Sequence, residues 1–179
     1  MGSGLQNLID RRAIHDCLLR FARGVDRRDP ELVRSAYHPD AIDDHGAMVG
    51  SAGDMIEWSR LRDRTGPAST RHHITNHSCE LDGDTAHAET YYIFDGRNTD
   101  GTTWIAGGRY LDRLERRDGA WKIAFRYCLV EWSGGLPAAE IPFADIPDVH
   151  LNGEPSRSRD DPSYRRPLIN RRARRIPQD

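Results

Sequence analysis

The stretch HHITNHSCELDGDTAHAETYYIFDG, residues 72–96, decides the fold, because at this point the chain changes from helical periodicity to strand alternation. Two runs with many β-branched and aromatic residues flank the turn DGD at 82–84, a pattern typical of a hairpin. Residues 102–132 repeat the arrangement around RRDGA at 116–120. The sequence therefore predicts a run of antiparallel strands through the middle of the chain.

Upstream of these strands the pattern is helical. Residues 5–25 carry apolar side chains at helical spacing, which predicts one long amphipathic helix. Asp29 and Pro30 then offer an N-cap and a first-turn proline for a short second helix over 30–37. The N-terminal part of the chain thus supplies two helices in succession.

Residues 41–50 predict a strand that turns at a glycine, and residues 51–64 a third helix. Helices followed by a run of antiparallel strands are typical of an α+β fold. We expect a curved sheet wrapped around the helices, with a pocket between the two layers.

The C-terminal part differs in composition from the rest of the 179 residues. We predict a folded domain over 1–135 and an extended, Pro- and Arg-rich arm over 136–179. Residues 153–179 carry eight arginines and four acidic residues. Such a tail could bind nucleic acid, but no aromatic residues alternate with the arginines of 171–175, so we expect it to wrap its own body or a partner subunit.

The sequence carries no apolar run near the ~18 residues that a membrane span needs. Its start lacks the apolar segment of a signal peptide, so we expect a cytoplasmic protein without membrane contact. The three cysteines, Cys17, Cys79 and Cys128, form no CxxC pair and read as buried apolar residues in a reducing compartment. Lysine occurs once, at Lys122, which excludes most lysine-based mechanisms.

Asp26 lies where the first helix should bury its apolar stripe, directly after Val25 and five residues after Phe21. One interpretation is a solvated acid at a helix end, although the helix dipole disfavours that position. The other is a half-buried carboxylate, which needs a partner to stay ionised.

The histidines of RHHITNH offer such partners. In a strand, His72 shares a face with Asn76, whereas His73 and His77 share the other face and lie ~13 Å apart. That separation is too long for two ligands of one metal ion, so we predict no metal site here.

Residues 43–45, Asp-Asp-His, lie in the strand predicted over 41–50. Alternation directs either Asp44 alone, or Asp43 together with His45, into the pocket. These oxygens could hold a hard cation, but no regular ligand motif accompanies them, and we predict neither metal nor cofactor. The chain also contains no P-loop, GxGxxG, GxSxG or HExxH motif, which leaves acid/base chemistry.

Arg126 interrupts an otherwise apolar last strand, WKIAFRYCLV. A buried arginine is costly unless it is paired, so we expect either an acidic partner or an anionic substrate group. The alternative is an arginine that points outward from the sheet.

The segments DRRAIHDCLLRFARGVDRRD, AYHPDAIDDHG, RHHITNHSCELDGDTAHAET and GGRYLDRLERRDGAWKIAFR resemble the SnoaL-like branch of the nuclear transport factor 2-like superfamily. The resemblance covers roughly residues 5–133. It implies a cone-shaped α+β barrel, in which a strongly bent mixed or antiparallel sheet wraps three N-terminal helices around a deep pocket. It also implies a homo-oligomer, a dimer or a trimer, for which a proline-rich arm is suited.

Two cofactor-free lyase families of this branch, the lindane dehydrochlorinases and the scytalone dehydratases, look most similar in site design. Both pair an aspartate at the end of the first helix with a histidine on a strand. The resemblance gives these roles to Asp26, in GVDRRD, and to His72, which opens the His-x-x-x-Asn pattern HHITN, with His73 as its neighbour. It matches the dehydrochlorinase arginine to Arg126, and Asp44 stands where the dehydratase has a tyrosine that assists the leaving group.

The departures from these families leave the substrate open. Phe21 replaces the dehydrochlorinase lysine, and Gly107 stands in place of the dehydratase's second histidine. Aromatic side chains favour a cyclic or aromatic ligand. The remaining candidates for contact with such a ligand are His73, Tyr92, Trp58, Trp104 and Tyr37.

The sequence thus predicts a cofactor-free lyase that eliminates water, a halide or formaldehyde from a cyclic or aromatic small molecule. His72 is the expected base, oriented by Asp26, and Arg126 and Asp44 are expected to assist the leaving group. The alternatives are an isomerase with the same base and a non-catalytic small-molecule-binding module of the same fold. Nucleic-acid binding through the arm is the least favoured.

Overall fold

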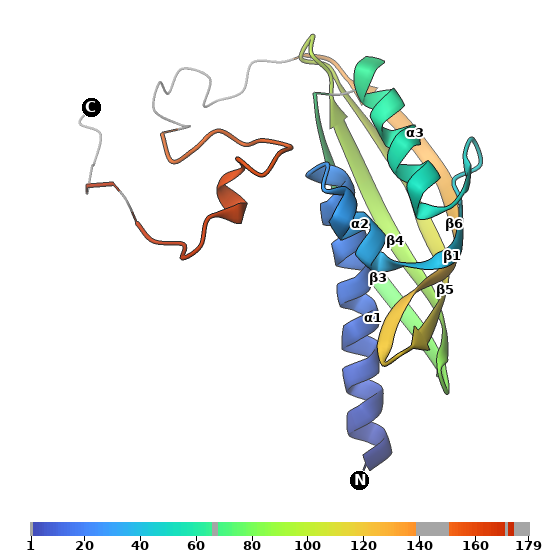
Figure 1. Cartoon of the computed structure of the whole chain (residues 1–179). Helices are drawn as coiled ribbons and strands as arrows, with labels where there is room; N and C mark the ends of the chain where they lie inside the picture. The colour runs from blue at the N-terminus through green and yellow to red at the C-terminus, as the bar shows by residue number, and fades with distance from the viewer. Residues whose placement is uncertain (1, 66–67, 139–150, 171, 174–179) are drawn as a thin grey trace.

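The computed structural model describes residues 2–65, 68–138, 151–170 and 172–173. Three helices cover one face of a single six-stranded sheet (Figure 1). The helices are α1 (Gly2–Asp26), α2 (Pro30–Ala36) and α3 (Ala52–Thr65).

The sheet is mixed and strongly bent. Its order is β2-β1-β6-β5-β4-β3, with β1 and β6 parallel and every other pair antiparallel. The strands are β1 (Tyr37–Asp44), β2 (Val49–Gly50), β3 (Ser69–Asp82), β4 (Thr85–Arg97), β5 (Thr103–Arg117) and β6 (Ala120–Leu136). The α+β class and the bent sheet around three helices are confirmed. The cone is open, since β2 and β3 remain its two edges.

Helix α1 anchors the core along its second half. Ile14, Leu18 and Phe21 are fully buried, as helical spacing predicts, and pack between α2 and the inner face of the sheet. The first turns behave differently, because they extend past the end of the sheet (Figure 1) and leave Leu5 and Leu8 exposed. The buried stripe is therefore shorter than the apolar pattern of the sequence.

The break between α1 and α2 follows the prediction. The Asp29 carboxylate accepts the backbone N–H of Leu32 at 3.1 Å and caps α2, with Pro30 in the first turn. Strand β1 begins at once at Tyr37, four residues earlier than predicted, because it pairs in parallel with β6 from Ile123 onward.

A β-bulge just before His77 changes which side chains of β3 face the helices. The sequence pattern placed Asn76 on the face of His72, and the same alternation puts Ser78 there. In the structure both are exposed, and His77 instead turns inward, with its ring 5.5 Å from the ring of His15 on α1. One extra residue in a strand reverses the alternation beyond it.

None of the helices among the described residues is long and apolar enough to cross a membrane. The described part of the C-terminal arm is irregular apart from one short 3₁₀ turn, Pro162–Tyr164. Positions 139–150, 171 and 174–179 of the predicted arm lie outside the described residues.

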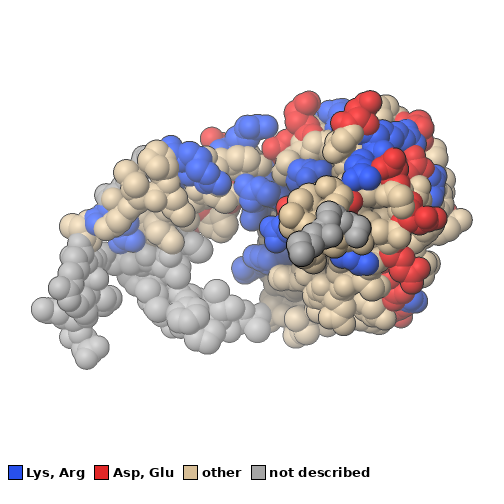
Figure 2. All heavy atoms as spheres, turned by 90° about the horizontal axis from the view of Figure 1, so that it is seen from below, with Lys and Arg blue, Asp and Glu red and all other residues tan. Residues whose placement is uncertain are grey.

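The arm docks against the C-terminal end of α1. Asp161, 5% exposed, accepts backbone N–H groups of Ser156 and Ser163 at 2.9 Å each and lies 3.9 Å from the guanidinium of Arg27. Basic side chains gather on the arm and on the side of the body next to it (Figure 2). In the opposite sense, Arg159 of the arm lies 3.2 Å from Asp29 of the body.

Candidate active site

Asp26 and His72 form a carboxylate–imidazole pair at the open end of α1. Oδ1 of Asp26 lies 2.7 Å from Nδ1 of His72, and Oδ2 accepts the backbone N–H of His72 at 2.8 Å. Thr70 donates its hydroxyl to Oδ1 at 3.2 Å. The two side chains are only 13% and 10% exposed. Of the two interpretations of Asp26, a solvated acid or a half-buried carboxylate with a partner, the structure supports the second.

This geometry fixes the tautomer of the neutral imidazole. An ionised carboxylate only accepts hydrogen bonds, so Nδ1 of His72 carries its proton toward Asp26. The lone pair then resides on Nε2, the other ring nitrogen. Rings of Phe21 and Phe94 lie at 6.3 and 4.8 Å from the imidazole and restrict its orientation.

His72 lines a cavity of about 190 Å³ between the helices and the inner face of the sheet. Aromatic and apolar side chains form most of its wall, and helices α1 and α3, strands β3 to β6 and the arm all contribute. Besides His72 and Phe94, the lining includes Val25, His45, Met55, Trp58, Tyr92, Trp104, Tyr110, Cys128 and Arg157.

A second carboxylate–imidazole pair reaches the same cavity from β1. Nδ1 of His45 contacts Oδ1 of Asp43, which is fully buried, and the hydroxyl of Tyr37 donates to Oδ2 of Asp43. Burial alone lowers the pKa of His45, but the hydrogen bond to Asp43 and the nearby Cys128 thiol outweigh it and raise the pKa to about 9. This imidazole is therefore positively charged at neutral pH.

The structure thus corrects the choice of Asp44. Of the two alternatives that strand alternation left open, the structure supports the second: His45 lines the cavity, and Asp43 is buried behind it. The carboxylate of Asp44 accepts the backbone N–H of Gly46 at 2.8 Å in the following turn. The same turn holds His45, whose N–H donates to the carbonyl of Met48 at 2.8 Å.

Arg126 has its acidic partner inside the protein. Its Nε and one terminal nitrogen donate to the two carboxylate oxygens of Asp112 at 2.7 and 2.8 Å, and both side chains are fully buried. The rings of Phe21 and Tyr110 lie 4.3 and 4.1 Å from its guanidinium carbon, in cation–π contact. Because Arg126 is not among the residues that line the cavity, the expected contact with a leaving group is not supported.

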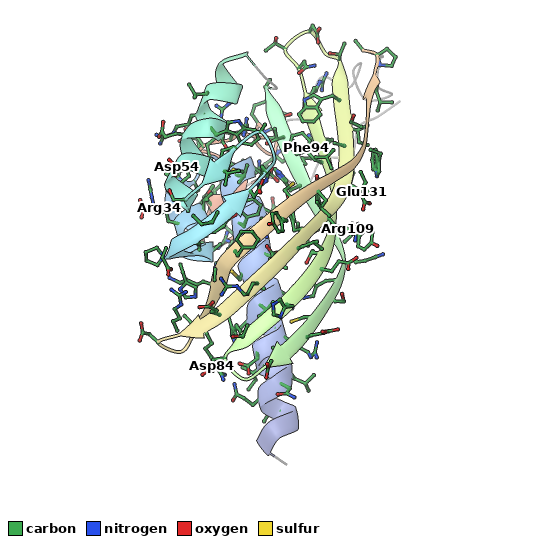
Figure 3. The ribbon with its side chains drawn as sticks, turned by 90° about the vertical axis from the view of Figure 1, so that its right-hand side faces the viewer. Arg34, Asp54, Asp84, Phe94, Arg109 and Glu131 are labelled. Carbon is green, nitrogen blue, oxygen red and sulfur yellow. The ribbon has the colours of Figure 1, made fainter. Side chains whose placement is uncertain are left out.

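His73 also lies away from the cavity. Its side chain is 54% exposed on the outer face of β3, where Nε2 lies 3.0 Å from Asp95. The same outer face carries the ion pair of Arg109 and Glu131 (Figure 3), at 2.6 Å between Nε and the carboxylate. Of the two adjacent histidines, His72 is therefore the one whose imidazole points into the cavity.

The remaining predicted contact residues divide into two groups. Trp58, Tyr92 and Trp104 line the cavity, whereas Tyr37 lies behind it and holds Asp43. Within the described part of the chain, no three His, Cys, Asp or Glu side chains are grouped so that they could hold a metal ion.

The arm reaches the mouth of the cavity through Arg157. Its guanidinium donates to the backbone carbonyls of Asp26 and Val25, at the end of α1, at 3.2 and 3.3 Å. Sequence reasoning missed Arg157 as a site residue, because the docking of the arm has no signal in local sequence. It left His45 as the alternative to Asp44, and only the register of β1 decides between them.

Solved structures with similar folds include enzymes. A hexachlorocyclohexane dehydrochlorinase, LinA type 2, is 22% identical and superposes with a TM-score of 0.72 over 80% of this chain and 99% of its own. LinA type 3 from Novosphingobium barchaimii LL02 is also 22% identical, with a TM-score of 0.70 over 78% and 98% of the two chains. A candidate scytalone dehydratase from Novosphingobium aromaticivorans is 19% identical, with a TM-score of 0.65 over 75% and 91%.

At these identities the structures show a shared fold. No curated protein sequence matches the chain significantly. The SnoaL-like domain family matches residues 6–127, which is more than half of the chain and includes both carboxylate–imidazole pairs. The chain therefore belongs to the SnoaL-like domain family, as its sequence resemblance predicted.

Proposed function

We propose that the protein is a cofactor-independent lyase in which His72 is the general base. The observation that carries this proposal is the 2.7 Å contact between Asp26 and His72 on the wall of an aromatic cavity. A base must lie within reach of a bound substrate and must expose a lone pair to it. Nε2 of His72 meets both conditions.

Asp26 acts here as a positioning residue. Its carboxylate holds the proton on Nδ1 and stabilises the imidazolium that forms when Nε2 takes a substrate proton. The second contact, from Oδ2 to the backbone of His72, fixes the distance between helix α1 and strand β3 at this point. A base positioned in this way typically accelerates a reaction by about 10²- to 10⁴-fold.

The cavity favours a cyclic or aromatic substrate. Trp58, Phe94 and Trp104 provide flat apolar walls, and a volume of about 190 Å³ suits a small ring system. Related structures of a dehydrochlorinase and a candidate dehydratase support elimination as the reaction type. This comparison favours a halide or water as the leaving group, and the family resemblance adds formaldehyde. An isomerase would use the same base without a leaving group.

The test compares His72→Gln with His73→Gln. The two histidines are adjacent, and each contacts a carboxylate, but only His72 lines the cavity. We would screen matched pairs of cyclic alcohols and chlorides, among them 3-hydroxy- and 3-chloro-1-indanone, by the absorbance of the alkene product. We expect His72→Gln to lose at least about 10²-fold in kcat while His73→Gln stays at the wild-type rate.

Near-full activity of a folded His72→Gln protein would contradict this function. A binding module would instead bind a ring compound without turning it over, and would tolerate loss of the imidazole. Calorimetric titration of wild type and His72→Gln with the same compounds separates the two functions.

A further inference from the structure

The cavity has two imidazoles, and the base needs only one. His72 is held by Asp26 from α1, and His45 is held by Asp43 from β1. Both rings line the same cavity, and each bonds its carboxylate through Nδ1. Nε2 of His72 is therefore the nitrogen available to a ligand. The His45 ring also hydrogen-bonds Cys128, so a ligand that reaches Nε2 of His45 must displace that thiol.

The two pairs differ in their surroundings. The Asp26–His72 pair is at the mouth, with side chains 13% and 10% exposed. Asp43 is fully buried and takes the Tyr37 hydroxyl as well as the His45 ring, and the side chain of His45 is 10% exposed. Beside His45 lie the cavity-lining Cys128 and the rings of Trp58 and Tyr110, at 5.8 and 6.2 Å.

This difference assigns opposite roles to the two rings. The Tyr37 hydroxyl donates a hydrogen bond to the buried Asp43 carboxylate and helps to keep it ionised. The ionised carboxylate in turn favours the charged form of His45, in agreement with the pKa of about 9 for that ring. An imidazolium cannot accept a proton but can donate one. The charged ring of His45 is therefore suited to act as an acid, opposite His72 as the proposed base.

We propose that His45, held by Asp43, is the general acid of this cavity and that the leaving group is a hydroxyl. The inference rests on the proposed function of His72. A halide departs as a stable anion and needs no proton, whereas hydroxide departs poorly unless it is protonated as the C–O bond breaks. The substrate class is then a cyclic alcohol whose neighbouring C–H is acidified by a carbonyl group or an aromatic ring.

The proposed step is balanced. Nε2 of His72 takes the proton of the C–H group, and that electron pair becomes the new C=C bond. The C–O bond breaks with its pair on oxygen, and the Nε2 proton of His45 completes a water molecule. His72 then returns one proton to solvent and His45 regains one, so that neither an oxidant nor a cofactor is consumed.

The test uses the alcohol and the chloride of one carbon frame, taken from the screen above. We expect His45→Gln to lower kcat/KM for the alcohol by about 10²-fold or more beyond any loss on the chloride. The chloride reaction also shows that the variant is folded. Asp43→Asn should act in the same direction, and Asp44→Asn, one residue along the chain but directed into the turn, should not.

Each other outcome is decisive. A wild-type protein that turns over the chloride but not the alcohol overturns this inference and leaves the proposed function standing. Equal loss of both reactions in His45→Gln also overturns it, since the ring would then only support the cavity. A wild-type protein inactive on both substrates ends the proposed function and this inference together.

Discussion

Asp26 holds His72 at two points, with one carboxylate oxygen 2.7 Å from the ring Nδ1 and the other 2.8 Å from the backbone nitrogen. The last residue of the first helix thereby fixes both the position of strand β3 and the orientation of its imidazole. A helix end usually disfavours an acid. Here two hydrogen-bond donors of His72 and the hydroxyl of Thr70 compensate for that position.

Replacing Asp26 by Asn should separate orientation from folding. An amide offers one acceptor oxygen where the carboxylate serves three donors, so the His72 ring loses its fixed tautomer. We expect kcat to fall by about 10²- to 10⁴-fold and the free energy of unfolding by about 1–3 kcal/mol. Asp95→Asn, which loosens the outer His73 instead, is the matched control and should keep full activity.

We expect the buried pair of Arg126 and Asp112 to contribute to the stability of the fold and not to take part in the reaction. Asp112→Ala leaves a buried guanidinium unpaired, and we expect a loss of about 3–5 kcal/mol in urea unfolding. The double variant Arg126→Met, Asp112→Leu removes both charges and should recover much of that loss. Glu57→Ala, which breaks the exposed pair with Arg60, should change little. A double variant as unstable as Asp112→Ala would contradict this account.

The charge on His45 predicts a pH dependence of stability. Its folded pKa of about 9 lies above the unfolded value of about 6.5, so the contribution is complete below pH 6.5 and is lost as the pH rises through 9. Thermal unfolding from pH 6 to 10 should show wild type and His45→Gln converging toward alkaline pH. A constant difference between them would show that His45 is neutral in the fold.

Close backbone approach at the bulge between β5 and β6 demands glycine at Gly108. A methyl group there would overlap the carbonyl oxygen of Leu129, a backbone atom that cannot turn aside. We expect Gly108→Ala to destabilise the protein by about 1–3 kcal/mol or more. Gly134→Ala on β6 meets nothing within 4 Å and should leave the melting temperature nearly unchanged.

Release of the arm should be measurable by proteolysis. Asp161 organises the docked segment through Ser156, Ser163 and Arg27, so Asp161→Ala should speed tryptic cleavage after Arg157 and Arg159. Asp160→Ala, which removes only an exposed contact with Ser158, is the control. Equal cleavage rates in the two variants would show that Asp161 does not hold the arm.

Local pattern predicted much of this molecule because local physics decides it. Helical spacing from Ile14 to Phe21, the Asp29 cap and the two glycine turns each act within a few residues and were recovered with small shifts. The pairing of Asp26 with an imidazole followed from the resemblance, and the structure shows that His72 is the inward member of the two adjacent histidines.

What the sequence by itself determined is the α+β order of elements, the family and the need of Asp26 for a partner. Only the tertiary structure decided that His45 lines the cavity on a buried Asp43, that Arg126 is bound to Asp112, and that Arg157 contacts the end of α1. These outcomes depend on strand register, on a bulge and on contacts between segments more than a hundred residues apart. Such choices depend on which buried polar groups find partners across the whole fold, and no window of neighbouring residues contains that information.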